Sequence, residues 1–113
     1  MTDRLPAGLE VSALLRQVSA AGGFAMVIAK GEPEAGTILV VLIENGAQAR
    51  AYERMPAPDG TRQWQCTRHD SPEKPGDFTE WLDRRHHQDR DLWIVELDIV
   101  RGERFIGLSP PVD

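Results

Sequence analysis

Apolar side chains recur at a helical spacing near the start of the chain. In the segment LEVSALLRQVSAAGG (9–23), Val11, Leu14 and Val18 fall on one side when successive residues turn by ~100°. Two glycines end the segment, and glycine is common just past a helix because it accepts a left-handed backbone. The pattern predicts a helix that ends at the glycine pair.

The spacing then changes to the alternation of β-strands. Asn45-Gly46 is a strong signal for a two-residue hairpin, because both residues tolerate a positive φ. The glycine-bracketed connection GEPEAG and the proline-rich loop MPAPDGT also favour turns. These signals predict a four-strand antiparallel meander, with strands at residues 24–30, 37–44, 47–54 and 62–68.

A second helix and a fifth strand follow a polar linker. Residues 78–89 have a helical apolar spacing, with Asp77 as the expected N-cap, and LWIVELDIV (92–100) is rich in strong β-formers. Residues 104–108 are expected to add a short edge strand. The order helix, four strands, helix, strand predicts an α+β fold, with a mainly antiparallel sheet of about five strands and two helices packed on it.

The length of 113 residues predicts a single domain, 1–113, with an ordered core at about residues 5–106 and short tails. The net charge of −5 argues against generic nucleic-acid binding, which needs a basic surface. A single cysteine excludes an intramolecular disulfide and fits a reducing compartment. No apolar run approaches the ~20 residues of a membrane helix. We therefore expect a cytoplasmic domain without a membrane segment, a cofactor or a metal.

The segment RRHHQDRDLW (84–93) contains two adjacent histidines that raise the question of a metal site. Neighbouring residues on a helix diverge by ~100°, whereas a helical zinc pair uses positions i and i+4. We therefore expect His86 and His87 to be solvated. Two interpretations remain for Arg85: an i,i+4 ion pair with Asp89 whose stem covers apolar surface, or an anion-binding arginine.

Assumed strand registers divide the sheet residues between two faces. The Asn-Gly turn sets Val41 opposite Arg50, and the proline-rich loop sets Tyr52 opposite Trp64. A slip by one residue would invert a strand. One face then holds mostly small side chains: Ala25, Val27, Ala29, Ile38, Val40, Leu42, Ala49 and Ala51. The other face holds Phe24, Met26, Ile28, Leu39, Val41, Ile43, Tyr52 and Trp64.

A sheet that is apolar on both sides must be covered on both sides. We expect one helix on each face; the alternative puts both helices on the alanine-rich face and a second molecule on the other. Arginines, tyrosine and tryptophan, which are enriched at interfaces, gather at the rim of that other face. The candidate binding residues are Arg50, Tyr52, Arg54, Trp64, Arg68 and Arg85. They favour a protein-interaction or self-association module, with a homodimer or another protein as the partner.

Three other interpretations stay open. Tyr52 and Trp64 could form an ordinary cross-strand pair that only stabilises the sheet. Single-stranded nucleic acid could stack its bases on the same two rings, although the negative net charge argues against it. Cys66, placed opposite Arg50, is the one candidate nucleophile of an enzyme. No histidine can be placed beside it, since His69 falls in the linker, and no catalytic residue is predicted.

Four stretches recur together in a known family: SALLRQVSAAGGFAMVIAKGEPEAGTILV, YERMP, WQCTR and RDLWIVELD. Over roughly residues 5 to 106, the chain resembles the small alphaproteobacterial proteins catalogued as domain of unknown function fourteen ninety-one. Arg90 stands where the family's DPDLWVVE pattern usually has proline. The family has no established activity, so the resemblance implies a single bacterial cytoplasmic domain and transfers no catalytic residue.

Overall fold

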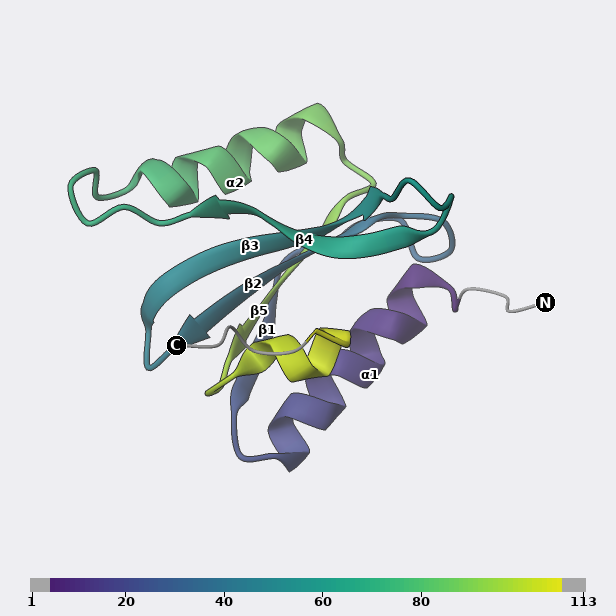
Figure 1. Ribbon diagram of the computed structural model, residues 1–113, viewed down its shortest axis with the longest axis horizontal. Coiled ribbons are helices and arrows are strands. Elements are labelled where there is room, and N and C mark those ends of the chain that lie inside the picture. Colours follow the sequence, from purple (N-terminus) through teal and green to yellow (C-terminus); the bar gives the residue numbers. More distant parts are fainter. Residues whose placement is uncertain (1–4, 109–113) are drawn as a thin grey trace.

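A five-stranded sheet lies between two helical layers in the computed structural model, which describes residues 5–108. Helix α2 covers one face, and α1 covers the other together with the short 3-10 helix η1 (Figure 1). The elements in chain order are α1 (Ala7–Ala20), β1 (Phe24–Ala29), β2 (Ile38–Glu44), β3 (Ala47–Pro56), β4 (Arg62–His69), α2 (Asp77–Gln88), β5 (Trp93–Asp98) and η1 (Gly102–Ile106). The predicted α+β fold and the predicted order of helices and strands are confirmed.

The last strand, β5, lies inside the sheet, whose order is β1-β5-β2-β3-β4. It pairs antiparallel with β1 and parallel with β2, and the remaining pairs are antiparallel. The predicted hairpin between β1 and β2 through residues 31–36 was therefore wrong. Burial explains the order, because β5 is buried along most of its length while β1 alternates between exposed and half-buried residues.

The turn between β2 and β3 lies where it was predicted. Asn45 and Gly46 have positive φ values of 52° and 76°, and Glu44 pairs with Ala47. Gln48 also has a positive φ, 58°, and the register shifts at this point. One extra residue of β3 therefore forms a bulge.

The bulge reverses the face that each later β3 side chain occupies. Val41 pairs with Ala51 and not with Arg50, and Tyr52 pairs with Val40. Tyr52 therefore lies on the α1 side of the sheet. Its predicted place on the same face as Val41, which is the α2 side, was wrong.

The strands β3 and β4 pair further into their connecting loop than predicted. Because β3 extends to Pro56, that residue pairs with Arg62, and Arg54 pairs with Trp64. The predicted pairing of Arg54 with Arg62 was wrong by two residues.

A second register shift, between Ala51 and Tyr52, sets Tyr52 opposite Cys66 and Arg50 opposite His69. The predicted Tyr52–Trp64 and Arg50–Cys66 pairs were therefore wrong. Tyr52 and Trp64 still share one face, because both pack into the core on the α1 side.

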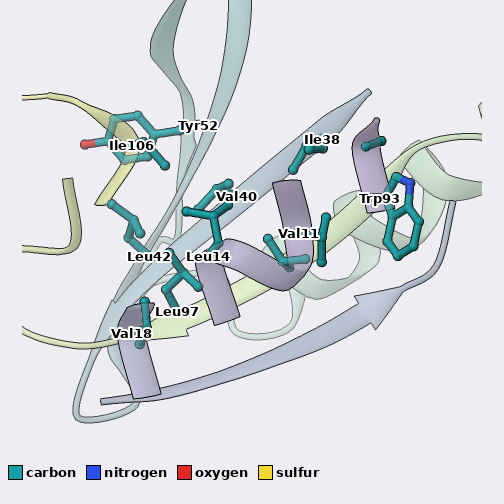
Figure 2. Close-up of a cluster of buried hydrophobic side chains, with 12 residues drawn as sticks. Val11, Leu14, Val18, Ile38, Val40, Leu42, Tyr52, Trp93, Leu97 and Ile106 are labelled. Atoms are coloured by element: carbon teal, nitrogen blue, oxygen red, sulfur yellow. The ribbon is translucent and has the colours of Figure 1, made fainter. Parts of the chain in front are cut away.

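Each face of the sheet has its own core, which confirms the expectation of one helix per face. On the α1 side, Leu14 and Val18 of α1 pack with Val40 and Leu42 of β2 (Figure 2). On the α2 side, the buried cluster consists of Leu39, Val41, Ile43, Ala51, Phe78, Leu82, Leu92 and Ile94.

The connection between β1 and β2 joins the start of α1 to the start of β5. The backbone N–H of Gly8 donates to Pro33 O at 2.8 Å, and α1 has no side-chain cap at its N-terminus. A loop carbonyl thus satisfies one of the free N–H groups of the first turn. From the other side, Trp93 Nε1 donates to Glu32 O at 2.8 Å.

Two local predictions were wrong. α2 is preceded by Gly76, whose φ is 86°, and Asp77 lies inside the helix and does not cap it. Residues 102–106 form η1 and not the edge strand predicted at 104–108. Among the helices within residues 5–108, none has both the length and the apolar character needed to cross a membrane.

Candidate interaction surface

The six residues predicted to form one binding surface lie on both faces of the sheet. The α1 side holds Arg50, Tyr52, Arg54 and Trp64, and the α2 side holds Arg68 and Arg85. Two register shifts cause the split, one at Gln48 in β3 and one at Thr67 in β4. A role in binding for these residues stays a prediction. Within the fold, the four arginines form ion pairs and the two aromatic rings pack into the core.

Glu103 of η1 is a buried carboxylate on the α1 side, with 2% of its surface exposed. Its Oε2 accepts hydrogen bonds from Arg50 Nη2 at 2.7 Å, from Arg50 Nε at 2.9 Å and from the Tyr52 hydroxyl at 2.9 Å. Burial alone would raise the pKa of Glu103, but these hydrogen bonds and the charge of Arg50 lower the pKa below its ordinary value. An ionised Glu103 therefore holds η1 against β3.

Arg54 links β3 to α1 in a similar way. Its two terminal nitrogens donate to the carboxylate of Glu10 at 2.9 and 3.1 Å. Its guanidinium also lies 4.8 Å from the centre of the Trp64 ring, a distance at which cation–π attraction operates. Trp64 is half-buried against the core on this side.

On the α2 side, Arg85 holds the helix to β3. Its terminal nitrogens donate to the Glu53 carboxylate at 2.7 and 2.6 Å, so its ion-pair partner is Glu53 and not Asp89. Burial alone would raise the pKa of Glu53, whereas hydrogen bonds from Arg85 and Thr67 lower the pKa overall.

Arg68 of β4 makes the fourth of these links, 3.4 Å from Asp77 of α2. The guanidinium groups of Arg68 and Arg85 lie 5.3 and 5.6 Å from the centre of the Trp81 ring. All four candidate arginines thus pair with a carboxylate inside the fold. Their pairing leaves little free positive charge for an anionic ligand.

Cys66 lies beside a histidine, which corrects the prediction that none could be placed there. Because β4 extends to His69, His69 Nε2 comes within 3.4 Å of Cys66 Sγ. Burial nevertheless raises the pKa of the Cys66 thiol, although the charge of Arg50 works in the opposite direction. A thiol with a raised pKa is mostly protonated near pH 7, and the protonated form is a weak nucleophile.

The two adjacent histidines diverge, as predicted, but the prediction that both are solvated is correct only for His87. His87 is exposed, with its Nδ1 2.9 Å from Asp83 O, whereas His86 is half-buried, with its Nε2 3.3 Å from Lys30 O. In the part of the chain that the structure describes, no three side chains of His, Cys, Asp or Glu gather so that they could hold a metal ion.

β1 exposes a row of large apolar side chains on the α2 side of the sheet. Phe24, Met26 and Ile28 are 77%, 54% and 42% exposed. α2 packs on β2, on β3 and on Ile94 of β5, and its cluster does not include these three side chains. We call this row the β1 strip.

A groove of about 570 Å³ lies between α2 and the sheet. Its floor is apolar and includes Ile43 and Ile94. Its helical wall carries Thr79, Asp83 and His86, which follow one face of α2 because they are spaced by four and three residues.

Glu96 of β5 lies on the sheet side of this groove, between Met26 of β1 and Val41 of β2. Burial raises the pKa of Glu96, and the nearby charge of Asp98 adds to the effect. Asp98 accepts a hydrogen bond from Asn45 N at 2.8 Å. Within residues 5–108, no hydrogen bond or ion pair is made to the Glu96 carboxylate. The carboxylate therefore lies half-buried without a compensating cation.

Phe24, Met26 and Ile28 were predicted to share one face of the sheet, but not to form an exposed surface. The insertion of β5 between β1 and β2 sets β1 one strand further from β2, and the α2-side cluster does not include these three side chains. The available signal was the composition of FAMVIA, which is apolar throughout and carries no charge.

Comparison with known proteins identifies the family. The crystal structure of a DUF1491 family protein from Caulobacter crescentus is similar, with a TM-score of 0.76 and 31% identity over 97% of this chain and 100% of that chain. An NMR structure of a DUF1491 family protein from the same organism has a TM-score of 0.76 and 29% identity over 99% of both chains. The solution structure of protein Atu0922 from A. tumefaciens has a TM-score of 0.75 and 28% identity over 98% of this chain and 99% of that chain. A search of curated proteins found no match. Residues 5–107 match the family described as "Protein of unknown function (DUF1491)", and the chain belongs to this family.

Proposed function

We propose that this domain is a protein-interaction module that self-associates through the free edge of β1. The β1 strip is the observation that carries the proposal. β1 ends the sheet on one side, has no charged residue and exposes three large apolar side chains. An exposed apolar edge strand is a template for pairing with another chain, because its outer N–H and C=O groups lack partners.

The opposite edge of the sheet has a different character. β4 exposes polar and charged side chains, including Arg62, Gln63 and Gln65. Natural proteins use charges of this kind to prevent edge strands from pairing. The charges of β4 therefore favour β1 as the edge that associates.

The β1 strip is also self-complementary. In an antiparallel pairing about a two-fold axis at Met26, Phe24 comes opposite the partner's Ile28 and Met26 comes opposite the partner's Met26. On the other face, Ala25 comes opposite the partner's Val27. Every contact in this arrangement is apolar, and the strip matches itself, as an isologous interface requires.

The predicted aromatic and arginine surface supports association less well. Tyr52 is 8% exposed, and each of the four arginines already pairs with a carboxylate. The same pairing weakens the case for binding of single-stranded nucleic acid.

An exposed, free Cys66 fits a reducing compartment, and we propose that the module is cytoplasmic.

Sedimentation velocity over a range of protein concentrations tests self-association. The unmodified protein should shift from monomer to dimer as concentration rises. Met26→Lys should remain a monomer, because it places a charge in the middle of the apolar strip and burying that charge is costly.

Leu9→Lys is the matched control, since Leu9 of α1 is 58% exposed and Met26 is 54% exposed. The control should dimerise like the unmodified protein. A monomer at every concentration, or a dimer that Met26→Lys leaves intact, would refute the proposal.

A further inference from the structure

We infer that the groove beside α2 is a docking site for a cationic amphipathic peptide segment of another protein, with Glu96 as its charged anchor. The walls of the groove belong mainly to α2, β2 and β5, and Ile28 of the β1 strip lies at one end.

The shape of the groove suits a peptide segment. Its lining extends from Gly46 and Gly76 at one end to Ile28 and His86 at the other, alongside α2. A helix of 12 residues is about 18 Å long, so the groove offers an elongated contact. An apolar floor flanked by polar walls is the arrangement that binds one face of an amphipathic segment.

The charges of the groove determine the charge of its occupant. Asp70, Asp83 and Glu96 line it, and His86 is the one basic side chain of the lining. The whole chain carries a net charge of −5. Lysine or arginine side chains at the edges of the segment would thus meet carboxylates on both walls, and an acidic segment would be repelled.

Glu96 is the strongest single reason for a cationic occupant. A half-buried carboxylate on an apolar face loses hydration, and it is normally compensated by a cation or by hydrogen bonds. Among the described residues, no hydrogen bond or ion pair compensates the Glu96 carboxylate, and burial accordingly raises its pKa. A cation from the docked segment would supply the compensation, and binding would lower the pKa of Glu96.

A titration of the ¹⁵N-labelled full chain followed by NMR tests the site. The probes are two short synthetic peptides, one of alternating leucine and lysine and one of alternating leucine and glutamate. We expect the lysine peptide to shift amide signals of β5 and α2 around the groove and to bind more weakly as salt is added. Glu96→Gln should weaken this binding about tenfold, the effect of losing one charge-assisted contact.

Glu80→Gln is the matched control, because Glu80 is an exposed glutamate of α2 outside the groove lining. It should bind the lysine peptide like the unmodified chain. Equal binding of the two peptides, binding unaffected by Glu96→Gln, or shifts confined to other surfaces would overturn the inference. Octylamine binding as tightly as the lysine peptide would also overturn it, since the groove would then be a site for small amphiphiles.

Discussion

Glu103 shows how a single residue can hold an element in place. It is the one buried charged residue among those described, and it receives hydrogen bonds from both Arg50 and Tyr52. Removing one partner of a buried ion pair leaves the other partner charged and poorly hydrated. The Glu103–Arg50 contact therefore stabilises the fold mainly because its loss would leave Arg50 charged and poorly hydrated.

Glu103→Gln should lower the free energy of unfolding by about 3–5 kcal/mol, because Arg50 would lose its compensating charge. Chemical denaturation measures this loss. Glu80→Gln, on the exposed surface of α2, should change stability by less than about 0.5 kcal/mol. A Glu103 variant as stable as this control would show that the ion pair contributes little.

The residue types at the ion pairs were visible in the sequence, but their partners were not. Arg85 was considered with Asp89, its neighbour one helical turn away, yet its partner is Glu53 on another element. Periodicity places a side chain on a face of its own element. Periodicity does not predict which residue of another element lies opposite that side chain, because the opposing residue depends on strand register.

At the scale of elements, the connection between β1 and β2 acts as a spacer across the end of β5. Glu32 N donates to Asp91 O at 3.0 Å, and Trp93 N donates to Thr37 O at 2.8 Å. A Cβ atom added to Gly31 would overlap Asp91 O and closely approach the Trp93 ring. The glycine is therefore required for close packing.

Gly31→Ala should destabilise the fold by about 1–3 kcal/mol, the usual cost of adding a methyl group to a packed site. A thermal melt or chemical denaturation gives the change. Gly8→Ala provides a contrast, because its Cβ would meet Pro33 O at an ordinary 3.5 Å and alanine favours the helix. Equal stability of the two variants would contradict tight packing at Gly31.

The positions of most elements could be predicted from the sequence, because helical and strand periodicities are local. The turn at Asn45-Gly46 was predicted for the same reason. The bulge at Gln48 was not, since glutamine carries no preference for a positive φ. That bulge moved Tyr52 to the other face of the sheet, and the second shift, at Thr67, left Arg68 on the α2 side.

At the scale of the whole molecule, carboxylates make stability depend on pH. Glu53 and Glu103 have pKa values lowered from the ordinary 4.5. Their stabilising contribution is present above about pH 4.5 and is lost as the pH falls through their folded-state pKa values. Glu96 acts in the opposite sense, because its raised pKa means that protonation favours the folded state.

We therefore expect the protein to lose stability as the pH falls below about 4.5. Urea denaturation at a series of pH values measures the trend. Glu53→Gln should be less stable near neutral pH but should lose less stability on acidification. Glu96→Gln should be at least as stable as the unmodified protein near neutral pH. Stability that rises on acidification would show that Glu96 outweighs the paired glutamates.

The position of β5 has a consequence for how the chain reaches its fold. β5 is made after the other four strands, yet it separates β1 from β2 and gives both of them a neighbour. Until residue 98 has left the ribosome, the β2–β3–β4 hairpins have an open inner edge and β1 has no partner strand. Assembly of the sheet must wait for contacts between distant parts of the chain, and such topologies fold slowly. During synthesis, the apolar edge of β2 is a second template for pairing with other chains, and it disappears only when β5 inserts.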